Sequence, residues 1–152
     1  MLLAAYRDTG YNVVLFLHVV AALVAMVPAV AHPIMFELEK RRDDGDLVAL
    51  ARRIVPASRI YAIAVVIAGV IGVGLVSMSD DLIEWGDTWV WLAILVWVAL
   101  NGVLHGAMIP AEKALAGGDR SALAKIDRVG PALGVMVLVL IYLMTVKPGG
   151  GF

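Results

Sequence analysis

The sequence contains no cysteine and little charge, and both absences restrict what the protein can do. Without cysteine, the 152-residue chain cannot form disulfides, bind iron–sulfur clusters through thiolates or use a thiol in catalysis. Charged residues make up only 16% of the chain, whereas hydrophobic residues make up 62%. A soluble domain of this length needs a more polar surface. The net charge of −1 gives no indication of a nucleic acid partner.

Sequence motifs of common catalytic sites are also missing. The chain has no G-x-G-x-x-G or Walker sequence and no H-E-x-x-H, and no Ser/His/Asp set is placed persuasively. The N-terminus lacks the Lys/Arg cluster of a secretory signal peptide, and the apolar run that follows is too long for one. We therefore expect this run to be a mature transmembrane helix.

Four apolar runs are the main feature of the chain. A helix needs about 20 apolar residues to cross a bilayer, and backbone polar groups in lipid must be paired within the segment. The sequence therefore predicts an all-α, four-helix transmembrane bundle that forms one integral membrane domain over residues 1–152. Its spans are expected at roughly 11–36, 58–78, 89–110 and 130–146.

The charges of the three connections predict the orientation. Lys and Arg are concentrated in the first and third connections, whereas the second has neither and is acidic. By the positive-inside rule, connections one and three are cytoplasmic, so both termini lie outside. Trp85, Trp89 and Trp91 fit an outer interfacial belt.

Each cytoplasmic connection is expected to hold a short amphipathic helix. LVALARRI and RSALAKIDRV place apolar residues three and four apart, and Asp46 and Asp119 (or Ser121) are the expected N-caps. Pro28 and Pro33 are expected to kink or end the first span, and Pro131 to occupy the first turn of the fourth.

Small residues recur at four-residue spacing on the second, third and fourth spans. They either form the interior of the bundle or allow contact with a second copy or a larger partner. The residues are Ala64, Ala68 and Gly72 on the second span, Gly102 and Gly106 on the third, and Gly130 and Gly134 on the fourth.

Two of the three histidines lie in the first span, although ionisable groups within a membrane are costly and indicate function. His18 and His32 are fourteen residues apart. That spacing is close to four helical turns, so they share one face but lie about 21 Å apart along the axis. They cannot bind the same centre.

His18 is the candidate ligand near the outer side of the membrane. Met78 and Met144 lie at a matching depth, and a His–Met pair is a sound axial set for a b-type haem. A structural hydrogen bond from His18 to Tyr142 or Thr145 is an equally good interpretation.

The other two histidines lie near the inner side. His105, on the third span, is closer in depth to His32 than to His18, with Arg59 and Glu37 at a similar level. The sequence GVLHG indicates that His105 points at a neighbouring helix, and His32 has a structural or interfacial role. The acidic residues are interpreted as solvated loop residues.

With these features placed, the chain resembles small four-helix bacterial membrane proteins: the HemJ-type protoporphyrinogen oxidases, the CopD-like membrane domains and, most closely, their relatives of unknown function. The resemblance rests on LFLHVVA, SRIYAIAVVIAGVIGVGL, HGAMIPAEKALAGGD and IDRVGPALGVMVLVLIYLMTVKP, in that order. It implies a multi-pass protein of the bacterial cytoplasmic membrane, with the family's functional first-span histidine at His18 and a third-span histidine at His105. The lysine that HemJ-type chemistry needs falls on Ser58, followed by Arg59. This departure argues against porphyrinogen oxidation.

The leading hypothesis is therefore a HemJ/CopD-like membrane protein that binds haem b or a copper ion, with a redox-associated role and no assigned catalytic residue. The candidate cofactor-binding residues are His18, Met144, Met78 and His105, and His18 is the candidate metal ligand. One alternative is an accessory subunit without a cofactor that docks on a larger membrane complex, for example a respiratory one, or on a second copy. Another, ranked last, is a small transporter with His32, His105 and Arg59 in an inner vestibule.

Overall fold

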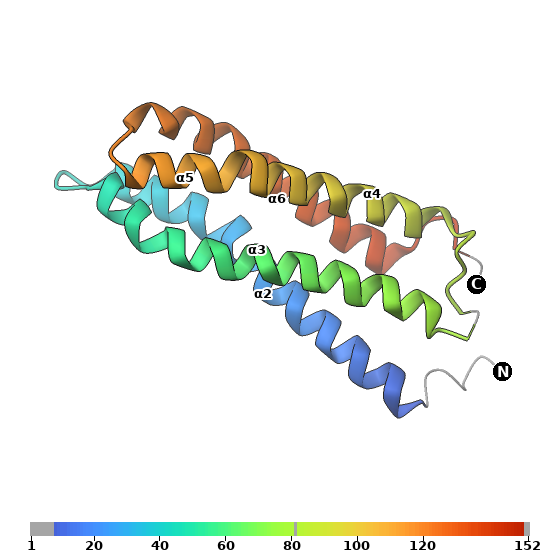
Figure 1. The fold of residues 1–152 in the computed structure, drawn as a ribbon. Coiled ribbons are helices and arrows are strands. Elements are labelled where there is room, and N and C mark those ends of the chain that lie inside the picture. Colours follow the sequence, from blue (N-terminus) through green and yellow to red (C-terminus); the bar gives the residue numbers. More distant parts are fainter. Residues whose placement is uncertain (1–7, 81, 151–152) are drawn as a thin grey trace.

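The computed structural model describes residues 8–80 and 82–150, and within these ranges the chain is helical without any strand. There are four long helical segments, and each runs roughly antiparallel to the one before it (Figure 1). They are α2 (Thr9–Lys40), α3 (Leu47–Ser77), the continuous segment of α4 (Thr88–Val103), η1 (Leu104–Met108) and α5 (Ile109–Ala116), and α6 (Leu123–Val146), which the short η2 (Arg120–Ala122) precedes. All four are long and apolar enough to cross a membrane, which confirms the predicted helical spans.

Aspartate side chains set two helix starts at the basic connections. The Asp46 carboxylate accepts hydrogen bonds from the backbone N–H groups of Val48 and Ala49, at 3.0 and 3.1 Å, and begins α3. Asp119 accepts from the backbone N–H of Ser121 at 3.0 Å and begins η2. Both residues were predicted as caps, because an N-cap side chain satisfies backbone donors that the first turn leaves unpaired.

The helices that these residues cap are not the separate short helices that we expected. LVALARRI forms the first turns of α3, and the end of RSALAKIDRV continues from η2 into α6 without a break. We expected Pro131 to mark the first turn of the fourth span, and Pro56 was given no role. Both lie inside long helices, as do Pro28 and Pro33 in α2, and Pro131 is not in the first turn of α6. Helices in membranes tolerate interior proline where neighbouring groups satisfy the freed carbonyls.

The bundle has two chemically different ends. We call the end with connections 41–46 and 117–119 the basic end, because the described Lys and Arg side chains other than Lys147 belong to that half. The acidic end holds connection 78–87, where α2 also begins and α6 ends (Figure 1). The basic and acidic connections identified in the sequence therefore lie at opposite ends of the bundle. Of the two histidines of α2, His18 lies in the acidic half and His32 in the basic half.

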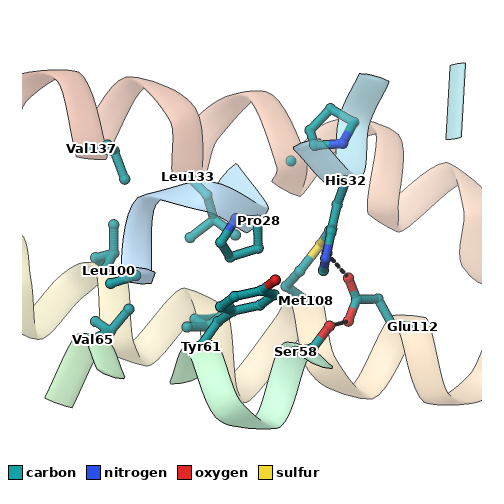
Figure 2. A pocket seen from close by; sticks show the side chains of 14 residues that line it. Pro28, His32, Ser58, Tyr61, Val65, Leu100, Met108, Glu112, Leu133 and Val137 are labelled. Atoms are coloured by element: carbon teal, nitrogen blue, oxygen red, sulfur yellow. Dashed lines mark hydrogen bonds and ion pairs between the residues drawn. The ribbon is translucent and has the colours of Figure 1, made fainter. Parts of the chain in front are cut away.

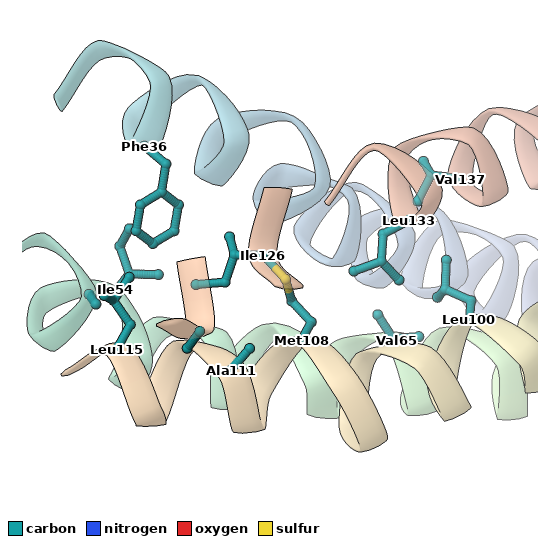
Figure 3. Packing of buried hydrophobic residues seen from close by; sticks show 12 residues of the cluster. Phe36, Ile54, Val65, Leu100, Met108, Ala111, Leu115, Ile126, Leu133 and Val137 are labelled. Atoms are coloured by element: carbon teal, nitrogen blue, oxygen red, sulfur yellow. The ribbon is translucent and has the colours of Figure 1, made fainter. Parts of the chain in front are cut away.

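The hydrophobic core is concentrated in the basic half (Figure 3). Its large buried side chains include Phe36, Ile54, Leu115 and Ile126. Towards the acidic end, the first half of α2 diverges from α4 and α6 (Figure 1). As far as the structure describes its side chains, no residue in the most apolar 18-residue stretch of α2 is buried. The two halves therefore differ in how tightly α2 is held.

Candidate functional site

A large groove lies between the diverging half of α2 and helices α3, α4 and α6. Its volume is about 570 Å³, within the range of roughly 300–1,000 Å³ that is typical of cofactor sites. The walls are mainly aliphatic and aromatic, with Trp89 and Trp97 among them. His18 and Met144 also line the groove, and Lys147 is the only Lys or Arg among its described lining residues.

His18 is held by the backbone of α3. Its Nδ1 lies 2.8 Å from the carbonyl oxygen of Ala68, and a carbonyl can only accept, so Nδ1 carries the hydrogen. Gly72, one turn further along α3, makes room for the ring: a Cβ there would lie 2.9 Å from His18 Cε1. In the neutral ring, Nε2 then keeps its lone pair, which is the form that binds a metal.

The opposite wall depends on a second glycine of α3. The indole of Trp97 packs directly on Gly69, where an added Cβ would overlap the ring, and Trp97 Nε1 donates to the carbonyl oxygen of Val65 at 2.8 Å. Ala68 and Gly72, from the small-residue stripe of the second span, thus pack α3 against α2. Gly102 and Gly106 face open space instead, with nothing within 4 Å of an added Cβ.

The structure separates the predicted cofactor residues. His18 and Met144 line the same groove, whereas Met78 ends α3 and does not line it. His105 lies in η1 with an exposed side chain, outside the groove. The expected alternative partners of His18 are also occupied or turned away: Thr145 Oγ1 donates to the carbonyl oxygen of Ile141 at 2.8 Å, and Tyr142 is 53% exposed.

A second polar site is buried in the basic half, where sequence analysis found only a structural histidine (Figure 2). Glu112 is 1% exposed, and its Oε1 lies 3.0 Å from Nδ1 of His32. The hydroxyl of Ser58 donates to its other oxygen, Oε2, at 2.6 Å. The edge of the Tyr61 ring faces His32, with the ring centroids 5.9 Å apart. We call these four residues, His32, Ser58, Tyr61 and Glu112, the acid–histidine cluster.

The acid–histidine cluster borders a small cavity of about 30 Å³. A cavity must have a volume of roughly 10–15 Å³ to hold one water, so this cavity has room for one or two waters. The rest of its lining is largely apolar and includes Met108, Leu133 and Val137. The carboxylate is therefore placed in a medium where an uncompensated charge is costly.

Two expectations are corrected here. Glu112 is a buried helical residue and not a solvated loop residue, and His32 is paired with Glu112 and not with His105. Arg59 and Glu37, which were placed at the same level, are exposed. Ser58, which is 3% exposed, joins α3 to this buried pair through its hydrogen bond to Glu112.

The π-helical turn η1 explains why His105 and Glu112 were misplaced. Residues seven apart make about two turns of an α-helix and lie on nearly the same face. In η1 the backbone N–H of Ile109 bonds the carbonyl of Leu104, so the turn holds one extra residue. His105 is then exposed while Glu112 is buried. The available signal was the recurrence of Met108, Ala111 and Leu115 around Glu112 on one helix face.

Comparison of the chain with protein-family models, with curated protein sequences and with solved structures gave no match.

Proposed function

We propose that this protein is a small multi-pass membrane protein that binds haem b in the groove, with Nε2 of His18 as an axial ligand. Its role is redox-associated, because haem supplies one-electron chemistry when bound. The chain itself provides the ligand, the apolar walls and the anchoring charge. No residue is proposed to be catalytic, in keeping with Ser58 at the position of the HemJ-type lysine.

The hydrogen bond from His18 to the Ala68 carbonyl is the observation that carries this proposal. A histidine that binds a metal commonly donates its second ring N–H to a carbonyl or carboxylate, which fixes both the tautomer and the ring orientation. This arrangement keeps Nε2 available as a ligand.

The rest of the groove suits an amphiphilic, planar ligand. Aromatic and aliphatic side chains form the walls, and Lys147 at the acidic end offers a cation for an acidic substituent such as a propionate. Met144 lines the groove on α6 and is the candidate second axial ligand. Met78 and His105 lie outside the groove, so the proposal no longer includes them.

Haem fits the donor set better than a bare copper ion. Among the residues that the structure describes, no group of three or more His, Asp or Glu side chains is placed to hold a metal ion. Haem brings four nitrogen ligands of its own and needs only one or two from the protein. One histidine with one methionine is sufficient for haem.

We further propose that the protein lies in the bacterial cytoplasmic membrane with its basic end facing the cytoplasm. The positive-inside rule supports this orientation, since the basic end carries the Lys and Arg residues next to the connections. The groove and His18 then lie in the outer half of the bilayer.

The test is the absorption spectrum of protein purified from membranes supplied with haem, in oxidised and reduced forms. We expect a Soret band that His18→Ala abolishes and that His105→Ala, on the exposed face of η1, leaves intact. Met144→Leu should alter the spectrum while Met78→Leu should not. A colourless and metal-free protein would overturn the proposal. If such a protein co-purified with stoichiometric membrane partners, the accessory-subunit hypothesis would replace it.

A further inference from the structure

We propose that the acid–histidine cluster is an occluded proton-binding site in the interior of the bundle. The His32–Glu112 pair holds one proton beyond a neutral imidazole and an ionised carboxylate, and exchanges that proton only when the surrounding packing opens. This site is separate from the groove, and the inference does not depend on haem binding.

The first argument is charge. The titratable side chains that line the cavity are His32 from α2, Tyr61 from α3 and Glu112 from α5, and α6 contributes only apolar residues and Gly130. The cations next to the cluster in sequence, Arg59 and Lys113, have exposed side chains. Without an added proton the cluster would carry an uncompensated negative charge in an apolar medium, which is strongly unfavourable.

The second argument is the hydrogen bonding of Ser58, which suits both states of the carboxyl group. When Glu112 is ionised, the hydroxyl of Ser58 donates to Oε2, and 2.6 Å is typical of an O–H bond to a carboxylate. When Glu112 is protonated, it can donate to Ser58 Oγ, which in turn can donate to the carbonyl oxygen of Ile54, 3.3 Å away. His32 Nδ1–H donates to Oε1 in either case. Gaining or losing a proton on the carboxyl group therefore leaves neither Oε2 of Glu112 nor the Ser58 hydroxyl unpaired.

The third argument is the seal on both sides of the cluster. Phe36, Ile54 and Leu115 each lie about one helical turn towards the basic end, and they are at most 4% exposed (Figure 3). Towards the acidic end, the residues that line both the small cavity and the groove form a second apolar layer. They are Ala25, Val65, Leu100 and Val137. Water that enters from either end of the bundle must pass one of these layers to reach Glu112.

The step itself is simple proton binding. One proton from water forms an O–H bond on Glu112 or an N–H bond on His32, and the same bond breaks on release. Either position neutralises the cluster, so the two are states of one site. No electron transfer or co-reactant is involved.

Infrared and nuclear magnetic resonance spectra of the full-length protein in detergent micelles test this proposal. With ¹⁵N-labelled histidine, we expect the wild type at neutral pH to show either an imidazolium at His32 or a carboxylic acid band that Glu112→Gln removes. His32→Gln should force the proton onto the carboxyl and give the acid band in every case. Exchange of that proton in D₂O should be slow. Glu37→Gln, which changes an exposed carboxylate on α2, should leave these signals unchanged.

A wild-type spectrum with a neutral His32 and an ionised Glu112 at neutral pH would overturn the proposal, as would an ionised carboxylate in His32→Gln. The wild-type measurement needs no variant, so it remains decisive if a substitution in the cluster prevents folding. Absence of haem would leave these signals unaffected, which keeps the two proposals distinguishable.

Discussion

The two histidines of α2 occupy contrasting halves of the same molecule. His32 is 6% exposed, lies against a buried carboxylate and is enclosed by the largest part of the core. His18 is only partly buried, bonds a backbone carbonyl and faces a groove of about 570 Å³. The same helix therefore carries one enclosed histidine and one that faces a groove. How closely the neighbouring helices pack on each half of α2 determines the difference.

The two halves differ in how their polar side chains are paired. The basic half buries a titratable pair whose facing atoms are hydrogen-bonded to one another, with Ser58 bonded to the second carboxyl oxygen. Among the residues that the structure describes, the acidic half offers Nε2 of His18 no hydrogen-bond partner and leaves a large apolar surface lining the groove. Substitutions that affect one half and not the other test this contrast.

The largest expected effect is at Glu112. Glu112→Ala leaves His32 and Ser58 buried without their partner, and removal of one member of a buried pair typically costs about 3–5 kcal/mol. We expect a loss of this size in reversible unfolding in detergent micelles. Glu37→Ala removes an exposed carboxylate from α2 and should change stability by no more than about 0.5 kcal/mol. Equal losses would mean that the acid–histidine cluster does not hold α2 in place.

A similar comparison applies to two phenylalanines of α2. Phe36 is 1% exposed in the basic half, whereas Phe16 is 65% exposed in the acidic half. Phe36→Ala leaves a cavity in the core and should destabilise the protein by about 3 kcal/mol. Phe16→Ala should have little effect in the same unfolding measurement. If Phe16→Ala were the more damaging, the diverging half of α2 would have to pack more closely than the structure shows.

Two glycines of α3 form a matched pair, of which Gly69 lines the groove and Gly74 does not. Gly69→Ala places a methyl group against the indole of Trp97 and should cost about 1–3 kcal/mol, as overpacking usually does. Gly74→Ala meets nothing within 4 Å and should be neutral or slightly stabilising, since alanine favours helix. Thermal unfolding of the two variants checks the difference. A Gly69→Ala protein as stable as the wild type would show that the Trp97 side chain can shift to make room for the methyl group.

Removing the aspartate at a helix start should change stability less than the destabilising substitutions above, and by different amounts at the two ends. Asp46 accepts hydrogen bonds from two backbone N–H groups at the basic end, so Asp46→Ala should cost about 1 kcal/mol. Asp87 begins α4 at the acidic end without a side-chain hydrogen bond to the first turn, so Asp87→Ala should cost less. Hydrogen exchange of the first turns of α3 and α4 measures both effects locally. A larger loss at Asp87 would contradict this ranking.

The smallest effect concerns pH at the basic end. The side-chain hydrogen bond from Ser121 lowers the pKa of Asp119 below its ordinary value. Because the folded pKa is the lower one, the contribution is present above the unfolded pKa and is lost as pH falls through the folded pKa. Ser121→Ala should raise the pKa of Asp119 towards its ordinary value in a nuclear magnetic resonance titration. An unchanged pKa would show that the backbone N–H of Ser121 is sufficient.

Most of the fold could be predicted from composition and periodicity. The length and hydropathy of the four runs identified the helical segments, and the aspartates before them identified two of the starts. The expected helix start at Pro131 was wrong because proline commonly occupies the first turn of a helix in soluble proteins, whereas helices in membranes tolerate proline in their interior.

The sites were less predictable because their chemistry depends on tertiary partners. His18 could be selected as a candidate from its depth, but its bond to the Ala68 carbonyl involves a backbone group that no side-chain pattern reveals. Glu112 was missed because loops usually hold the acidic residues of membrane proteins. Its burial depends on Ser58 and His32, which are distant in sequence, and on the local geometry of η1.

The wide turn η1 has a further consequence for the third membrane segment. The extra residue rotates the side chains of α5 about the helix axis relative to those of α4. Trp97 and Leu100 can keep their orientation towards the groove while Glu112 keeps its own towards His32. The orientations of Trp97 and Glu112 on this continuous helix are therefore set separately, although Leu100 lines both the groove and the small cavity.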